Sequence, residues 1–326
     1  MTRKPADAPD AALAQAVRGG DRRALARAIT LVESTLPEHQ TRAQAVLAQL
    51  LPYTGQALRI GLSGVPGVGK STFIETFGLH LIAAGHRVAV LAVDPSSRVS
   101  GGSILGDKTR MERLARERAA FIRPSPAAGT LGGVAARTRE VMLVAEAAGY
   151  DVVIVETVGV GQSETAVADL CDAFVLLQLP NAGDELQAMK KGVMELADII
   201  AINKRDIDPA ASARAAQALR AATHLLAASA EVPVLEVSAL KQQGIAELWD
   251  AVQAFVADEK DAGRFELRRS RQALAWLEDE VQRALRGRFE SHPAVREVLQ
   301  PYRAAVAQGE LTPTQAAADL LRRFET

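Results

Sequence analysis

The sequence predicts an α/β protein built on a doubly wound, mostly parallel sheet, with helical segments before and after it. Short apolar runs alternate with helical stretches through the middle of the chain. The runs are continuous in Val, Ile and Leu, which is typical of strands buried on both faces of a parallel sheet. A glycine-rich segment joins the first run to the helical stretch after it, as in sheets that bind phosphate groups.

Composition and charge narrow the class of protein. The 326 residues are 48% hydrophobic and carry a formal net charge of -1, so we expect a globular core and no nucleic-acid partner. The single cysteine, Cys171, excludes an intramolecular disulfide and fits a reducing cytoplasm. Residues 1–10 are charged, contain two prolines and predict a frayed end instead of a signal peptide. Because no apolar run is long enough to cross a bilayer, we expect a soluble, cytoplasmic protein without a membrane partner.

Residues 1–55 predict a helical extension. Apolar residues recur at helical spacing over 21–34 and again over 37–51, and Pro52 and Gly55 end the second helix. We expect these helices to cover one edge or face of the next domain, and we assign them no chemistry.

Six apolar runs predict the strands of a domain over residues 56–258. They cover residues 58–62, 88–93, 152–156, 174–179, 199–203 and 232–237. Ligands of such sheets bind beyond the carboxyl ends of the strands, so the residues that follow each run are the candidates for function.

The first run leads into the pattern G-x-x-x-x-G-K-[ST], the phosphate loop of P-loop NTPases. Its residues are Gly64, Val65, Pro66, Gly67, Val68, Gly69, Lys70 and Ser71. A helix over 71–84 follows, so the motif lies between a strand and a helix, as its mechanism requires. Backbone N–H groups would surround the phosphates, Lys70 would reach the β and γ phosphates, and Ser71 would bind Mg²⁺. Thr72 completes the predicted nucleotide-binding residues of this loop.

Two acids follow neighbouring runs on the phosphate-loop side of the predicted sheet. Asp94 and Glu156 can complete a magnesium site with Ser71, because Mg²⁺ needs only a few protein oxygens. Taken alone, Asp94 could instead cap a turn, and Glu156 could be an acid at a strand end without a ligand. Because both lie beside a phosphate loop, we favour the interpretation that they bind the metal. Gly159 would let the segment after Glu156 move with the γ-phosphate.

Two loops carry further charged residues. The glycine-rich segment 100–110 suits a mobile loop, and its Asp107 is well suited to lie near a metal triphosphate. A second loop, over 181–192, is charged, and its residues alone indicate a solvated face.

The fifth run ends in the pattern N-K-x-D. Its residues are Asn203, Lys204, Arg205 and Asp206, and the sixth run ends in Ser238, Ala239 and Leu240. An aspartate can accept hydrogen bonds from guanine N1–H and the N2 amine, whereas adenine would leave this buried charge unpaired. A backbone N–H in the turn formed by Ser238, Ala239 and Leu240 could donate a hydrogen bond to the guanine carbonyl oxygen. These residues therefore predict a site for GTP and GDP.

Beyond residue 258 the sequence becomes charged and helical. Leu267, Leu274 and Val281 recur every seven residues and form a narrow apolar seam on a long helix. A further helical stripe follows, and Thr312 with Pro313 opens a last helix. On this pattern alone, pairing within the chain and pairing between two chains fit equally well.

With the phosphate loop, Asp94, the Glu156 block and the N-K-x-D segment identified, the chain closely resembles the MeaB/ArgK GTPases over nearly its whole length. The resemblance implies a GTPase that is slow alone and stimulated by its partner, adenosylcobalamin-dependent methylmalonyl-CoA mutase. It implies that the protein gates adenosylcobalamin loading into the mutase and protects that enzyme. It also implies that residues 259–326 form a homodimerisation arm.

The same resemblance implies roles for individual residues. Lys70, Glu156, Asp94 and Asp107 would form the catalytic set, and the last three would hold the metal with Ser71. The loop over 181–192 matches a third switch of the family. Its coupling residues would be Asp184, Gln187 and Lys190.

Two departures and two alternatives qualify this interpretation. Val160 stands where Ras-like GTPases carry their water-positioning glutamine, which leaves that role unassigned. One cysteine and five scattered histidines exclude the metal delivery of related nickel metallochaperones. The alternatives are an ATP-dependent kinase of arginine or a transport protein, as the older ArgK name suggests, and a binding module with a structural nucleotide.

Overall fold

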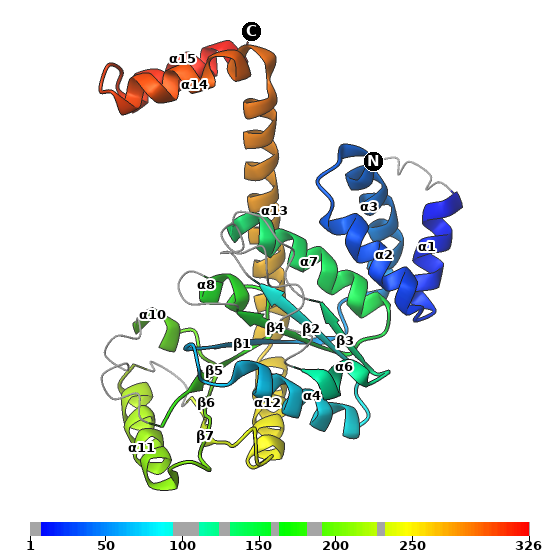
Figure 1. The fold of residues 1–326 in the computed structure, drawn as a ribbon, viewed down its shortest axis with the longest axis vertical. Helices are drawn as coiled ribbons and strands as arrows, with labels where there is room; N and C mark the ends of the chain where they lie inside the picture. Colours follow the sequence, from blue (N-terminus) through cyan, green and yellow to red (C-terminus); the bar gives the residue numbers. More distant parts are fainter. Residues whose placement is uncertain are drawn as a thin grey trace. The chain divides into compact units, whose positions relative to one another are not determined.

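The computed structural model describes residues 8–93, 111–123, 131–157, 163–180, 191–226 and 232–325 (Figure 1). The chain divides into two compact units, Met1–Arg269 and Ser270–Thr326. Among the described helices, none is both long and apolar enough to cross a membrane.

The first unit is built on a parallel sheet of seven strands. They are β1 (Leu58–Gly64), β2 (Val88–Val93), β3 (Ala120–Arg123), β4 (Val152–Thr157), β5 (Ala173–Gln178), β6 (Ile199–Ile202) and β7 (Val234–Glu236). Their order is β3-β2-β4-β1-β5-β6-β7, which confirms the predicted doubly wound parallel sheet. The sequence did not predict β3, because this edge strand has only four residues and ends in a charged one.

Helices cover both faces of the sheet (Figure 1). One face carries α4 (Lys70–Ala83), α6 (Glu112–Arg116) and α12 (Ile245–Asp261). The other carries α7 (Leu131–Ala147) and α8 (Ser163–Ala168), while α11 (Pro209–Leu226) packs on β6 and β7. Within the described ranges this unit also has two short helices, η1 (Leu51–Tyr53) and α10 (Lys191–Met194).

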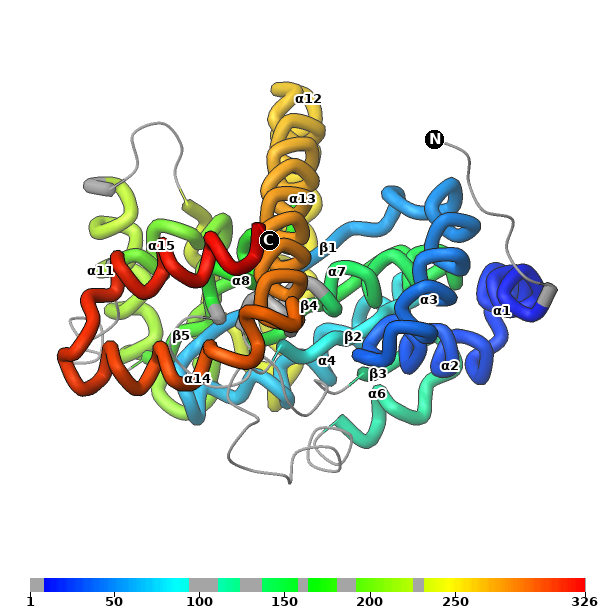
Figure 2. Tube along the Cα trace, turned by 90° about the horizontal axis from the view of Figure 1, so that it is seen from above, coloured from blue at the N-terminus to red at the C-terminus, as the bar shows by residue number. Residues whose placement is uncertain are grey.

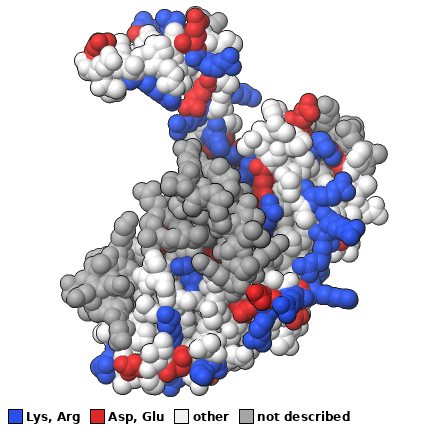
Figure 3. Space-filling model, in the orientation of Figure 1, with Lys and Arg blue, Asp and Glu red and all other residues white. Residues whose placement is uncertain are grey.

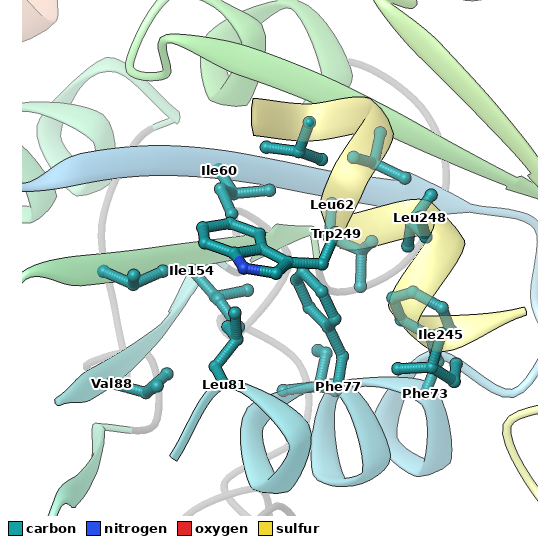
Figure 4. Close-up of a cluster of buried hydrophobic side chains, with 14 of the residues drawn as sticks. Ile60, Leu62, Phe73, Phe77, Leu81, Val88, Ile154, Ile245, Leu248 and Trp249 are labelled. Atoms are coloured by element: carbon teal, nitrogen blue, oxygen red, sulfur yellow. The ribbon is translucent and has the colours of Figure 1, made fainter. Parts of the chain in front are cut away.

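The core lies between the sheet, α4 and α12 (Figure 4). Ile60 and Leu62 of β1 meet Phe77 of α4 and Trp249 of α12, and all four side chains are buried. The rings of Phe77 and Trp249 lie 6.1 Å apart between centroids in an edge-on arrangement. These contacts fix α4, which follows the phosphate loop, against the sheet.

Three N-terminal helices pack on one another and on α7, which confirms that they cover the sheet domain (Figure 2). They are α1 (Ala8–Arg18), α2 (Arg22–Glu33) and α3 (Pro37–Leu50). Asp21 caps α2 by accepting hydrogen bonds from Ala24 N and Arg23 N, which lower the pKa of its carboxyl. The predicted frayed end is wrong for residues 8–10: Asp10 is buried in α1 and pairs with Arg42 at 2.8 Å.

The first turns of α13 (Arg264–Ser291) attach to the amino ends of two strands. Arg269 donates to both carboxylate oxygens of Asp172, with Nε–Oδ1 and Nη2–Oδ2 distances of 2.8 and 2.6 Å. Arg268 likewise donates to both carboxylate oxygens of Asp198, with Nη1–Oδ2 and Nη2–Oδ1 distances of 3.0 and 3.2 Å. Burial raises the pKa of Asp198, and the Arg268 guanidinium opposes that shift. Since Asp172 precedes β5 and Asp198 precedes β6, the two arginines hold the strand starts.

The second unit contains the rest of α13, α14 (Pro293–Ala307) and α15 (Pro313–Phe324). The predicted start of α15 is confirmed, because Thr312 and Gln315 form a reciprocal capping box with Pro313 in the first turn. Phe324 packs edge-on against Phe289, with ring centroids 5.5 Å apart. The seam residues Leu274 and Val281 are exposed by 62% and 48%, so no described residue of this unit covers them fully.

Basic and acidic side chains both occur over the described surface of each unit in Figure 3. This mixture agrees with the balanced composition of 38 basic and 39 acidic residues.

Candidate nucleotide-binding site

Strand order brings the predicted site residues to one edge of the sheet. The carboxyl ends of β2, β4, β1, β5, β6 and β7 follow one another in that order. Glu156 at the end of β4 pairs in register with Leu62 of β1 and Ala92 of β2, and it is 4% exposed. It therefore lies between the strand that enters the phosphate loop and the strand that ends one residue before Asp94.

The phosphate loop requires glycine at two of its positions. A Cβ on Gly64 would lie 2.7 Å from the Leu177 carbonyl oxygen, closer than any real side chain allows. Gly69 is the N-cap of α4 with φ 94°, a left-handed conformation that glycine adopts without strain. The loop thus passes close to β5 and turns sharply into the helix, which directs the first N–H groups of α4 toward a ligand.

Lys70 lies folded over this loop. Its Nζ donates a hydrogen bond to the Gly64 carbonyl oxygen at 2.6 Å. Burial lowers the pKa of the ammonium group, and the negative charges of Glu156 and Glu164 oppose the shift. Ser71 is half-buried and Thr72 exposed at the start of α4. The structure therefore brings Lys70, Ser71 and Glu156 to one place, with a cation near the position of the phosphates.

A buried pair of hydroxyl groups joins the two central strands beneath the loop. Ser63 Oγ and Thr157 Oγ1 lie 3.0 Å apart, and the two residues are 2% and 0% exposed. Ser63 directly precedes the phosphate loop and Thr157 directly follows Glu156. Sequence reasoning missed this pair; the polar residues that interrupt two apolar strands were its only signal.

Asn203 connects the two segments predicted to read guanine to the phosphate loop. Its Nδ2 donates to the Val68 carbonyl oxygen at 2.9 Å, and its Oδ1 accepts from Ala239 N at 3.0 Å. Lys204 has a φ of 65°, and its Nζ donates to the Gly67 carbonyl oxygen at 2.7 Å. Two hydrogen bonds thus join the N-K-x-D segment to the phosphate loop, and a third joins it to the turn after β7.

Asp206 is oriented by a second set of contacts. Ser238 Oγ donates to its Oδ1, and Lys241 N donates to that hydroxyl at 3.1 Å. Thr76 of α4 donates to the Ala239 carbonyl oxygen at 2.9 Å. Sequence reasoning did not select Thr76, since a threonine in mid-helix has no motif. Leu240 is 72% exposed beside this cluster.

Six predicted site residues lie outside the described residues. They are Asp94, Asp107, Gly159, Asp184, Gln187 and Lys190. Among the side chains that the structure describes, no group of three or more His, Cys, Asp or Glu could hold a metal ion.

The profile of one protein family, described as methylmalonyl Co-A mutase-associated GTPase MeaB, matches residues 25–294. The chain belongs to this MeaB family. A probable GTPase of Mycobacterium tuberculosis is 56% identical over 313 residues, covering 95% of this chain and 93% of the relative. The mitochondrial methylmalonic aciduria type A homolog of Mus musculus is 45% identical over 321 residues, covering 94% of this chain and 77% of the relative.

The crystal structure of a protein named LAO/AO transport system kinase covers 100% of both chains with a TM-score of 0.76 and 39% identity. These similarities confirm the predicted resemblance and the P-loop GTPase fold. The chain is therefore a GTPase, and the N-K-x-D segment around Asp206 was predicted from sequence to serve such an activity.

Proposed function

We propose that this protein is a GTP-hydrolysing chaperone that gates adenosylcobalamin loading into methylmalonyl-CoA mutase and protects that enzyme. We infer the partner from the family match, because the family is described as associated with this mutase. The hydrogen bonds that join Asn203 to Val68 and Ala239 support the proposal of guanine-nucleotide binding, since they hold the proposed base-reading segments against the phosphate loop. The proposed location is the cytoplasm.

Each residue of the site has a proposed role in this function. Lys70 contacts the β and γ phosphates once its hydrogen bond to Gly64 is replaced, and Asp206 accepts from the guanine edge. The Ser71 hydroxyl and the Glu156 carboxylate have oxygen donors that suit Mg²⁺, and Asp94 and Asp107 would complete this set. Bound Mg²⁺ would neutralise negative charge on the phosphates.

Coupling to the mutase requires different surfaces in the GTP and GDP states. A nucleotide shifts the partner's binding only through a difference in the partner's affinity for those states. We assign this coupling to Asp184, Gln187 and Lys190. We further propose a homodimer formed through residues 259–326, because the exposed seam on α13 suits pairing with a second helix.

The test is hydrolysis of GTP and of ATP, each with and without methylmalonyl-CoA mutase. Selective GTP turnover that rises with the mutase supports the proposal, whereas turnover indifferent to the mutase rejects this partner. Lys190→Ala is expected to keep basal turnover and lose stimulation. Lys191→Ala makes the same charge change at the next residue and serves as the control, so equal stimulation in both variants would reject the assignment to Lys190.

The kinase alternative rests on the name of one structural relative, LAO/AO transport system kinase. The Asp206 carboxylate argues against ATP, because adenine offers no N1–H donor to it. Transfer of a phosphoryl group from ATP to a protein or to arginine, with no GTP turnover, would favour the kinase.

A further inference from the structure

A polar cavity of about 790 Å³ lies beside the guanine-reading carboxylate. Five segments form its walls: α4, the start of α6, the chain between β6 and the first residue of α11, the loop between β7 and α12, and the first turn of α12. The polar side chains among its lining residues include those of Thr76, His80, Arg113, Arg205, Asp206 and Glu247. Its volume is within the range of small-molecule sites.

This cavity adjoins the proposed nucleotide site but does not include the phosphate-binding part of it. No described residue of the phosphate loop lines it, and neither do Asn203, Lys204 or Ala239. Asp206 is the residue shared by the cavity and the proposed nucleotide site, because it lines the cavity while its Oδ1 accepts a hydrogen bond from Ser238 Oγ beside the proposed base position. A ligand of this cavity would therefore contact the base-reading carboxylate without occupying the phosphate position.

The walls of the cavity rest on a rigid base. α4 and α12 are joined below it by the packing of Phe77 and Phe73 against Trp249, Leu248 and Ile245 (Figure 4). The backbone N–H of Arg113 donates to Glu75 Oε1 of α4 at 2.7 Å, which fixes the start of α6 on the same helix. The cavity is thus formed by elements already held together, as expected of a preformed site.

The chemistry of the lining favours an anion. Arg113 and Arg205 have exposed side chains, and their guanidinium forks match the geometry of carboxylate or phosphate oxygens. One of the two lining acids, Asp206, is committed to Ser238 and to the base, which leaves Glu247 as the opposing charge. Leu79, Ala83 and Ile245 add apolar surface for a short aliphatic chain.

Two lining residues connect the cavity to base recognition. Thr76 donates to the Ala239 carbonyl oxygen at 2.9 Å and so holds the turn that follows β7. Asp206 belongs to the base-reading segment itself. A ligand that orders these residues changes the affinity for nucleotide by the same factor as the nucleotide changes the ligand's affinity.

We propose that this cavity is a second ligand site, for a small aliphatic molecule that carries a carboxylate or phosphate group, and that its occupancy alters guanine-nucleotide affinity. The proposal rests on nucleotide binding by this chain but not on the mutase. Arg113 and Arg205 bind the anionic group, and Thr76 and Asp206 transmit occupancy to the base.

The experiment measures the affinity of the full chain for a fluorescent GDP analogue at constant free Mg²⁺, with increasing succinate or methyl phosphate. Sodium chloride at equal ionic strength and uncharged succinamide are the controls. We expect one of the two anions to change the affinity for the GDP analogue about fivefold, a typical allosteric coupling. Arg113→Ala and Arg205→Ala should each abolish the response, whereas Arg116→Ala, a change at an arginine of α6 outside the cavity lining, should retain it.

Unchanged affinity for the GDP analogue with both anions would overturn the proposed effect on nucleotide binding, and the absence of any heat of binding in isothermal titration calorimetry would overturn the ligand site itself. A response that survives both cavity substitutions would also overturn it, because the anion would then act at the phosphate loop. The assay contains no mutase, so its failure is distinct from failure of the chaperone function.

Discussion

Asn203 offers the sharpest test of how the site is held together. The side chain is 2% exposed and joins the Val68 carbonyl oxygen of the phosphate loop to the Ala239 N–H of the base-reading turn. Asn203→Ala removes both partners at once and leaves a buried acceptor and a buried donor without them. Each such group costs about 1–3 kcal/mol, so we expect a loss of about 2–6 kcal/mol in the free energy of unfolding.

The assay is urea denaturation followed by circular dichroism, together with affinities for GTP and ATP. Thr76→Val is the matched comparison, because it removes one hydrogen bond to the same turn and nearly keeps the side-chain shape. We expect about 1 kcal/mol for Thr76→Val and a larger loss of GTP affinity for Asn203→Ala. An Asn203→Ala protein that is less destabilised than Thr76→Val, or that keeps full GTP affinity, would refute the reasoning.

Four further predictions follow from other contacts. Asp206→Asn should weaken GTP binding and admit xanthosine triphosphate, measured as competition between the two nucleotides; unchanged GTP affinity would show that Asp206 does not read the base. Ser63→Ala and Thr157→Val should show a coupling of about 1 kcal/mol in a double-mutant cycle of unfolding, whereas strictly additive losses would exclude a hydrogen bond between them. Arg269→Ala should cost about 3–5 kcal/mol in unfolding free energy, because it removes the guanidinium partner of the buried Asp172 carboxylate and leaves it the backbone N–H of Arg59. Arg286→Ala should change the unfolding free energy little, because its ion pair with Glu290 is exposed. The thiol of Cys171 is 1% exposed and burial raises its pKa, so a thiol reagent should label it only after unfolding; rapid labelling of the folded protein would contradict the buried position.

Much of the sheet was predictable because its strands are buried on both faces and therefore read as continuous apolar runs. The run at 58–62 and the phosphate loop after it could be identified from residues alone. β3 could not, because four residues at a sheet edge carry too little pattern. α1 was missed because two prolines near its start outweighed the short helical pattern.

The motif residues of the site were likewise predictable, but the contacts that organise them were not. Asn203 was predicted as part of the guanine-nucleotide site, and the structure adds that its side-chain amide joins two backbone segments 135 and 36 residues away in sequence. Contacts of this kind depend on the three-dimensional arrangement of strand ends. No local pattern marks Thr76 or Ser63, because their partners lie on other elements.

The arginine pair at the start of α13 has a practical consequence for the smallest fragment that can bind nucleotide. A chain cut after residue 258, at the end of the predicted nucleotide-binding domain, would lack Arg268 and Arg269. Asp172 and Asp198, which accept their hydrogen bonds at the starts of β5 and β6, would then lose their guanidinium partners. β6 is four residues long, about 13 Å, so this defect would lie one short strand away from Asn203. We therefore expect a shortened protein to need residues up to 269 if the strand end that leads to Asn203 is to stay intact.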